Sequence, residues 1–307
     1  MLKSTTHGLT YTALVAVVIF WGLSFVATKI ALETFPTFTL IFIRFSLAAF
    51  FFCGLMLIRG VPKFSRGDHI RIFLMALFEP GLYFIFETMG LQYTSAPKTA
   101  LIIATIPVAV LVFAFLFINE RPAVTSVVGI GLSLIGIGIL VVGDPNFSWQ
   151  FRGSLLGDLL IIGAVITAAL YMVCARNLGK GHAALDITGF QMIYGALLYA
   201  PVFFWELPAV QWSVISSRSV VALVYLTLFA TCAAFLFYNY ALTKLPAGKA
   251  SVFINGIPVV TAVAAWLLLG ETLTILQLCG GLLVLTAVCL TNLSGAKTRR
   301  SVAAEFA

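Results

Sequence analysis

LQYTSAPKTALIIATIPVAVLVFAFLFINE, residues 91–120, returns in altered form as LTKLPAGKASVFINGIPVVTAVAAWLLLGE, residues 242–271. The two stretches align without a gap at a constant offset of 151 residues, and about 11 of the 30 aligned pairs are identical. Eight of the other 19 pairs exchange one apolar residue for another. The aligned pairs include Lys98 with Lys249, Pro107 with Pro258 and Glu120 with Glu271. The chain is therefore built from two related halves.

The composition of the chain excludes a water-soluble fold. Of its 307 residues, 61% are hydrophobic and 9% are charged, and the mean hydropathy is +1.09. Soluble domains carry about 25% charged residues, which they need to cover a water-facing surface. We therefore expect the lipid bilayer to surround this chain. The net charge of +7 then reports membrane topology and not a nucleic-acid partner.

Ten apolar runs are long enough to cross a membrane. A helix needs about 20 apolar residues to span the hydrocarbon core. The runs cover residues of about 11–30, 37–58, 70–91, 97–118, 122–142, 154–174, 185–205, 219–241, 248–269 and 272–293. The sequence thus predicts an all-α polytopic membrane protein with ten transmembrane helices.

Lysine and arginine are distributed unevenly between the two sides of this predicted bundle. If the N-terminus is cytoplasmic, 13 of the 18 basic residues lie inside and four lie outside, among them Lys29 and Lys98. Arg44 lies within a span. Cytoplasmic loops are enriched in lysine and arginine, so we expect both termini in the cytoplasm.

Each half holds five spans, so the second half enters the membrane from the opposite side of the first. The repeat is then inverted, with a pseudo-two-fold axis in the membrane plane. We expect a first five-helix repeat at 1–148, a second at 149–294 and a disordered basic cytoplasmic tail at 295–307. Inverted repeats are typical of secondary transporters, whose halves rock around a central site.

Several short motifs identify a family that the chain resembles. They are WGLSFVATK at 21–29, Arg44-Phe45, LQYTSA at 91–96, Asn119-Glu120-Arg121, Tyr240-Ala241-Leu242 and Leu269-Gly270-Glu271. Together they resemble the drug/metabolite transporter superfamily, and within it the ten-span EamA-type exporters. The resemblance implies export of amino acids and other small metabolites across a bacterial inner membrane. It points most closely to the branch that includes aromatic amino acid exporters.

The third span carries the sharpest local signal. Glu79, Tyr83 and Glu87 are spaced i, i+4 and i+8, so they share one helix face. A charge near mid-membrane, as Glu79 would be, costs about 2.5–3.5 kcal/mol. We interpret Glu79 and Tyr83 as lining a substrate path, where Glu79 contacts an amine or takes up a proton. The alternative is a structural hydrogen bond within the bundle, and Glu87 is either path-lining or interfacial.

Two prolines fall near the middle of spans 4 and 9. Pro107 and Pro258 each remove a backbone donor and crowd the carbonyl four residues back. Broken helices at matched positions of two halves indicate a transporter's binding site. We expect hinges at Pro107, Pro258 and Gly256, and expect Asn255 to contact the freed backbone or a substrate. The alternative is that the kinks only shape the bundle.

Further candidates for the cavity are aromatic or carry an amide. Trp21 and Phe25 lie one turn apart on span 1. Aromatic residues of membrane helices are commonly packing or interface anchors, but the family resemblance favours a cavity-lining Trp21. The remaining candidates are Tyr171, Gln191, Tyr194 and Tyr238.

Other charged positions are interpreted as structural. Arg44 is expected to reach outward to the interface or to pair with an acid such as Glu33. Glu120 and Glu271 are expected in the first turn of the following helix, where the helix dipole favours a carboxylate.

The leading hypothesis is export of amino acids or other amphipathic metabolites by alternating access. Efflux of cationic drugs or toxicants, attracted by Glu79 and Glu87, is the alternative. A membrane enzyme or assembly factor is a third possibility that the short loops disfavour. We expect no enzyme activity, no metal site and no cofactor. Direct ATP coupling is not expected either, because no phosphate-cradling glycine-rich loop or ATPase motif is present. The expected partner is a small-molecule substrate, and a monomer fits two halves fused in one chain.

Overall fold

The structure is a computed structural model that describes residues 2–118, 124–150, 152–175, 182–244 and 253–305. Within these ranges the regular secondary structure is entirely helical. Together with the apolar length of the helices, this confirms the prediction of an all-α polytopic membrane protein.

The described part of the first half forms seven α-helices and one π-helical segment, η1. They are α1 (Leu2–Leu32), α2 (Thr37–Arg59), α3 (Arg66–Ala76), η1 (Leu77–Leu82), α4 (Tyr83–Gly90), α5 (Ala96–Ile103), α6 (Ile106–Ile118) and α7 (Val124–Val142).

The second half has a similar order, with a second π-helical segment, η5, and two short 3-10 turns. Its elements are α8 (Ser154–Ala175), α9 (Ala184–Glu206), η3 (Leu207–Ala209), η4 (Trp212–Val214), α10 (Ser217–Tyr225), η5 (Leu226–Ala233), α11 (Ala234–Lys244), α13 (Ile257–Leu269) and α14 (Ile275–Glu305). α14 extends to Glu305, and the disordered tail expected at 295–307 stays a prediction.

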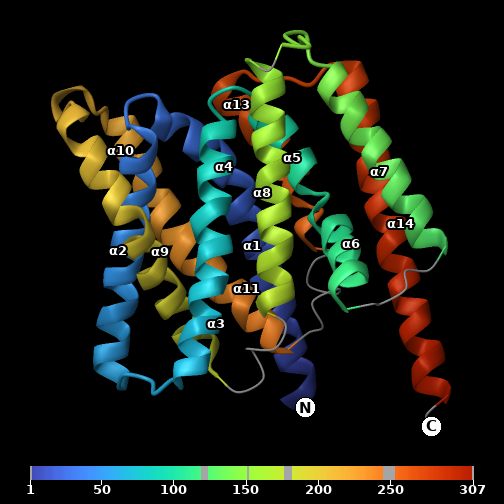
Figure 1. Cartoon of the computed structure of the whole chain (residues 1–307), viewed down its shortest axis with the longest axis horizontal. Coiled ribbons are helices and arrows are strands. Elements are labelled where there is room, and N and C mark those ends of the chain that lie inside the picture. The colour runs from blue at the N-terminus through green and yellow to red at the C-terminus, as the bar shows by residue number, and fades with distance from the viewer. Residues whose placement is uncertain (1, 119–123, 151, 176–181, 245–252, 306–307) are drawn as a thin grey trace.

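Among the residues that the structure describes, seven helical segments are long and apolar enough to cross a membrane, and three further apolar helices are shorter. The short ones are Val127–Val142, Ile257–Leu269 and Ile275–Leu290. Within the described residues each of the ten predicted spans overlaps a helix, but a count of ten crossings stays a prediction. Both ends of the chain lie at the same end of the bundle (Figure 1), and their cytoplasmic position likewise stays a prediction.

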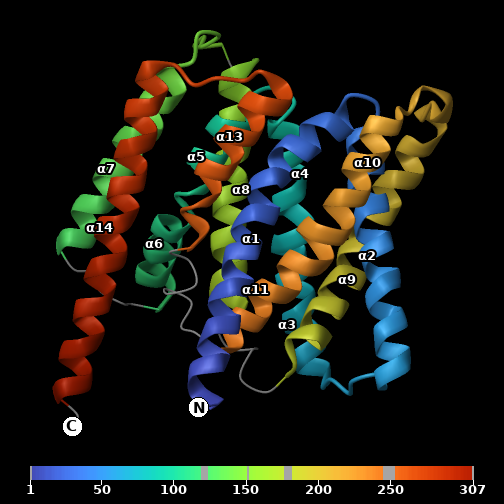
Figure 2. The same cartoon turned by 180° about the vertical axis from the view of Figure 1, so that it is seen from behind.

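The helices of the two halves pack on one another reciprocally. α2 packs on α9, and α7 packs on α14 at one side of the molecule (Figures 1 and 2). The third span of the first half, through α4, packs on α8, and the third span of the second half, through α10 and α11, packs on α1. Such an exchange of equivalent contacts is what a two-fold relation between halves produces.

Helix irregularities also recur at aligned positions. η1 covers Leu77–Leu82, and the offset of 151 residues carries it onto positions 228–233, which lie within η5. α6 begins at Ile106 and α13 begins at the aligned Ile257. π-helical turns are rare and occur frequently at functional sites. The two halves therefore depart from regular helix at the same places.

Candidate functional site

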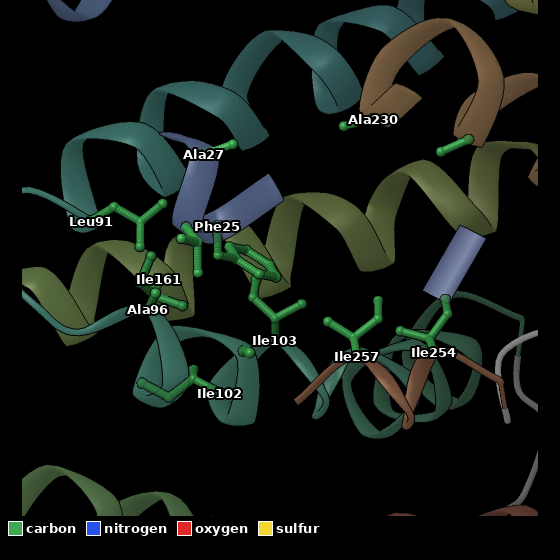
Figure 3. Packing of buried hydrophobic residues seen from close by; sticks show 14 of the residues in the cluster. Phe25, Ala27, Leu91, Ala96, Ile102, Ile103, Ile161, Ala230, Ile254 and Ile257 are labelled. Atoms are coloured by element: carbon green, nitrogen blue, oxygen red, sulfur yellow. The ribbon is translucent and has the colours of Figure 1, made fainter. Parts of the chain in front are cut away.

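A small internal cavity of about 50 Å³ lies between the two halves. Its walls come from α1, α2, η1, α4, α5 and α6 of the first half, and from α8, α11 and α13 of the second. Figure 3 shows part of its apolar wall, where Phe25, Ile103, Ile257 and Ile254 follow one another. A buried water needs about 10–15 Å³ of such space, so the cavity holds only a few waters in this form. A metabolite requires it to widen.

Seven of the ten residues predicted to line a cavity do lie around this one. They are Trp21, Phe25, Glu79, Tyr83, Glu87, Tyr171 and Tyr238. Contact of these residues with a substrate stays a prediction.

Gln191 and Asn255 lie just behind the cavity wall. The Gln191 side chain donates a hydrogen bond from Nε2 to the Glu79 carbonyl oxygen at 2.7 Å, so it supports the wall. Asn255 follows the cavity-lining Ile254, and both polar atoms of its side chain are buried without a hydrogen-bond partner among the described residues. A buried amide with no partner is costly, so Asn255 is poised to bond a group that approaches the helix break.

Tyr194 lies apart from the cavity. Its hydroxyl is 2.8 Å from His69 Nδ1, and its ring packs edge-on against Phe73 near the end of the bundle that carries the loop between α2 and α3. The spacing of three residues from Gln191 placed both on one broad face of α9. Only the packing of α9 against α3 and η1 decides which of the two reaches the centre.

Glu79 is positioned by the distortion of its own helix. It leaves the helical conformation within η1 (φ −145°, ψ 113°), immediately before Pro80, whose ring cannot donate a backbone hydrogen bond. Side chains from α9 satisfy the carbonyls that this opens: Gln191 bonds Glu79, and Tyr199 bonds Pro80 at 2.9 Å and also Gly81. The distortion turns the Glu79 carboxyl toward the cavity, where no described residue forms an ion pair or hydrogen bond with it.

The opposite half repeats this arrangement without the acid. Ala230 aligns with Glu79, and its carbonyl oxygen accepts a hydrogen bond from Trp21 Nε1 at 3.1 Å. The Trp21 ring also packs on Tyr238, with 5.1 Å between ring centroids. Trp21 therefore supports the distorted helix and also lines the cavity. The sequence left open whether it packs between helices or lines the cavity, and it does both.

Arg44 is the cavity residue whose position sequence reasoning missed. The expected pairing with Glu33 is wrong: Glu33 pairs with Arg218 at 3.5 Å, while Arg44 is buried and lines the cavity. Its Nε donates to Thr231 Oγ1 at 2.6 Å, on η5. A signal was available, because Arg44 matches Gln191 in a looser alignment of spans 2 and 7, at an offset of 147 residues. Each of the two reaches the π-helical segment of the opposite half.

The predicted helix breaks fall just before the two prolines. α5 ends at Ile103 and α6 begins at Ile106, so Pro107 lies in the first turn of α6, where no backbone donor is needed. Pro258 occupies the same place in α13, preceded by Gly256 as the capping residue. The residues at the two breaks, Ile103 and Ile254, line the cavity. Their role as hinges stays a prediction.

One end of the bundle is closed by a buried ion-pair cluster. Lys98, expected near the outer surface, is fully buried, with its Nζ 2.8 Å from Asp144 and 2.6 Å from Asp158. Ser154 completes the cluster by donating to Asp144 at 2.7 Å. Burial raises the pKa of Asp144, but hydrogen bonds from Lys98 and Ser154 outweigh it and hold this pKa below its ordinary value.

Glu271 lies beside this cluster and does not begin a helix as expected. α14 starts only at Ile275, and the Glu271 carboxylate instead accepts a hydrogen bond from the backbone N–H of Ala96 at 2.8 Å and pairs with Lys29. Lys29 in turn donates to the Thr94 carbonyl oxygen at 2.9 Å. The aligned residues of the other half, Lys249 and Glu120, lie outside the described residues.

The described part of the chain holds no group of three or more histidine, cysteine, aspartate or glutamate side chains placed to bind a metal ion. The chemistry that the site offers is therefore that of its aromatic rings, its two carboxyls at Glu79 and Glu87, and the Arg44 guanidinium.

Comparison with protein families gives one match, and it occurs twice along the chain. The profile described as the EamA-like transporter family matches residues 8–142 and again residues 155–293. Together the two segments cover most of the 307 residues.

Similar proteins are found in archaea, bacteria and plants. An uncharacterized transporter of Archaeoglobus fulgidus is 28% identical over 272 residues, which are 88% of this chain and 94% of that protein. The uncharacterized transporter YcxC of Bacillus subtilis is 30% identical over 294 residues, 91% of each chain. A WAT1-related chloroplastic protein of Arabidopsis thaliana is 28% identical over 298 residues, 92% of this chain and 69% of its own.

A solved crystal structure has a similar fold. It superposes with a TM-score of 0.67 at 17% sequence identity, and the match covers 94% of this chain and 98% of the other. At this identity the likeness concerns the fold alone.

Proposed function

Because the chain belongs to the EamA-like transporter family, we propose that it is a secondary transporter that exports small amphipathic metabolites, amino acids first among them, from the cytoplasm. Its relatives are described as transporters and not as enzymes. The chain is a multi-pass membrane protein, and we place it in a bacterial inner membrane with both termini cytoplasmic.

The observation that carries this proposal is an uncommitted carboxyl inside an aromatic cavity. Glu79 is buried and lines the cavity, and among the described residues no cation pairs with it. A buried carboxylate needs a counter-charge or a proton. The ammonium group of an amino acid supplies that charge, and the rings of Trp21, Phe25 and Tyr238 offer apolar surface to its side chain.

Alternating access is the mechanism that the two halves favour. The cavity lies between them, and the helix breaks before Pro107 and Pro258 occupy equivalent positions beside it. We propose that these breaks are hinges about which two inverted halves, 1–148 and 149–294, open the cavity to one side and then to the other. A single chain holds both halves, so a monomer suffices.

Counterflow in proteoliposomes tests the proposal. Purified protein is reconstituted into liposomes loaded with one unlabelled amino acid, and uptake of the labelled form is followed for a broad panel that includes the aromatic ones. We expect counterflow above that of protein-free liposomes for at least one amino acid. Folded protein that accelerates none of them contradicts amino acid transport.

Efflux of cationic compounds is the second candidate, and it is favoured by a specific observation. Two carboxyls, Glu79 and Glu87, face one cavity that holds a single guanidinium. Resistance of expressing cells to cationic dyes, combined with no counterflow of amino acids, would favour this candidate.

A further inference from the structure

We propose that Arg44 selects substrates that carry a carboxylate, so that the cavity takes zwitterions such as α-amino acids in preference to cations. This inference rests on the proposed transport function and names the substrate class of the same cavity. It depends on how Arg44 is held, on which of its donors are unused, and on the charge that it faces.

The Arg44 guanidinium is held firmly on one edge and on its flat face. Its Nε donates to Thr231 Oγ1 at 2.6 Å. Its central carbon lies 4.5 Å from the centre of the Phe84 ring and 5.5 Å from that of Phe45, which is cation–π distance. These contacts orient the planar group. They do not involve its outer edge, which carries the two Nη atoms.

The outer edge of the guanidinium carries two unused amino groups. Among the described residues, no hydrogen bond or ion pair is formed by either Nη atom, although Arg44 is only 4% exposed. The nearest acid in the cavity wall, Glu87, accepts a hydrogen bond from Thr88 at 3.0 Å and forms no ion pair with Arg44. Arg44 lines the cavity, so this edge is available to an acceptor that enters it. The two parallel donors of such an edge match a carboxylate.

Glu79 provides the charge of opposite sign in the same cavity, and its carboxyl is likewise uncommitted. A zwitterion satisfies both groups, its carboxylate at Arg44 and its ammonium at Glu79, while its side chain packs among the rings. An amine without a carboxylate leaves the Arg44 donors unpaired and is repelled by the guanidinium. The unpaired Arg44 guanidinium therefore disfavours binding of an amine that has no carboxylate.

A different role for Arg44 makes a different prediction. If Arg44 only neutralises the Glu87 charge, removing both charges together in an Arg44→Gln/Glu87→Gln variant should restore the preference of the wild type. If Arg44 binds the substrate carboxylate, the double variant should lack that preference.

The test compares two probes on each reconstituted protein: phenylalanine and 2-phenylethylamine, which differ only by the carboxylate. The ratio of the potencies of the two probes as competitors in counterflow measures the preference for the carboxylate. This ratio does not depend on how much of the protein is folded. We expect wild type to prefer phenylalanine, and Arg44→Gln to reduce that preference by about 10- to 100-fold, the value of a hydrogen bond between charged groups. Arg44→Lys keeps the charge but not the paired donors, and should recover only part of it. Arg59→Gln, on an exposed residue of the same helix, is the matched control and should leave the ratio unchanged.

The outcomes separate this inference from the proposed function. Amino acid counterflow with an unchanged ratio in Arg44→Gln, or with the ratio restored in the double variant, overturns the role of Arg44 and leaves the transport proposal standing. Preference of the wild type for 2-phenylethylamine overturns the zwitterion class and supports cation efflux. Counterflow of no compound in folded wild type overturns both.

Discussion

Glu79 and Ala230 show how one backbone frame carries two different side chains. Both lie at aligned positions of π-helical segments, and both carbonyl oxygens accept a hydrogen bond from a side chain of another span, Gln191 in one case and Trp21 in the other. The shared backbone opens the helix on both sides of the cavity. The carboxyl occurs on one side only, so the substrate recognition that we propose for Glu79 is asymmetric within a symmetric frame.

The Glu79 carboxyl is expected to be required for transport. Glu79→Gln keeps the size of the side chain but removes the charge that would pair with an ammonium group, and we expect counterflow affinity to fall about 10- to 100-fold. Glu33→Gln is the matched control: it makes the same chemical change at a half-exposed pair with Arg218, where little is expected. Unaltered counterflow in Glu79→Gln would remove this residue from the binding site.

Lys98 is expected to be a stabilising residue because it neutralises buried acids. Lys98→Met leaves Asp158 fully buried without its cation, and we expect a loss of about 3–5 kcal/mol in the free energy of unfolding. Thermal unfolding in detergent at neutral pH measures it. The depressed pKa of Asp144 means that its stabilising contribution is present above about pH 4 and is lost as the pH falls through that lowered value.

Two variants complete this experiment. Lys98→Met/Asp158→Asn removes the uncompensated charge and should recover part of the loss. Lys63→Met, on an exposed loop residue, should change nothing. Equal stability of Lys98→Met and wild type would mean that the cluster does not hold this end of the bundle.

At the scale of elements, glycines allow α7 and α14 to approach closely. A Cβ atom added to Gly136 would lie 2.9 Å from the Gly280 carbonyl oxygen, and one added to Gly280 would lie 2.9 Å from the Gly136 carbonyl oxygen. Small residues take this role in membranes, where helices associate through close packing and not through exclusion of water. At this pair the missing side chains let a helix of each half pack against the other.

A side chain at Gly136 is therefore expected to separate the two helices. Gly136→Leu should lower the free energy of unfolding by at least about 2 kcal/mol, because neither backbone can move aside. Gly138→Leu is the matched control on the same helix, where an added Cβ atom meets nothing within 4 Å. Thermal unfolding of the two variants side by side should show a loss for the first only. An equal loss of stability in both variants would indicate that the substitution acts through helix propensity and not through the contact between α7 and α14.

At the scale of the whole molecule, two ion-pair clusters connect the halves at one end of the bundle. The clusters around Lys98 and Lys29 join α1, α5, α8 and the end of α13, and so tie the two halves at one end of the bundle. The cavity below them is too small for a metabolite. In the alternating-access mechanism that we propose, the halves therefore move apart at one end or the other.

Membrane orientation is a property of the whole molecule that labelling can determine. The loops around Lys63 and Ser148 lie at opposite ends of the bundle (Figure 1). In a background without the five native cysteines, Ser148→Cys should react with a membrane-impermeant maleimide added to intact spheroplasts, and Lys63→Cys only after permeabilisation. The reverse pattern would place both termini outside.

Composition and local pattern were sufficient for the helical membrane fold, for the recurrence of its two halves and for the positions where spans 4 and 9 break. These properties depend on hydropathy, proline and spacing, which act over a few turns of helix. They also sufficed to nominate Trp21, Glu79 and Tyr83 for the cavity wall.

Only the tertiary structure decided which polar side chains meet. Arg44 faces the cavity, Tyr194 does not, and Lys98 is buried between two acids, because each outcome depends on how a helix is rotated and on what packs against it. Helical spacing places residues on a common face, but the neighbours of that face lie far along the chain, at separations of 187 residues for Arg44 and Thr231, 125 for Tyr194 and His69, and 46 for Lys98 and Asp144. Their identity follows from the packing of the two halves and not from any local pattern.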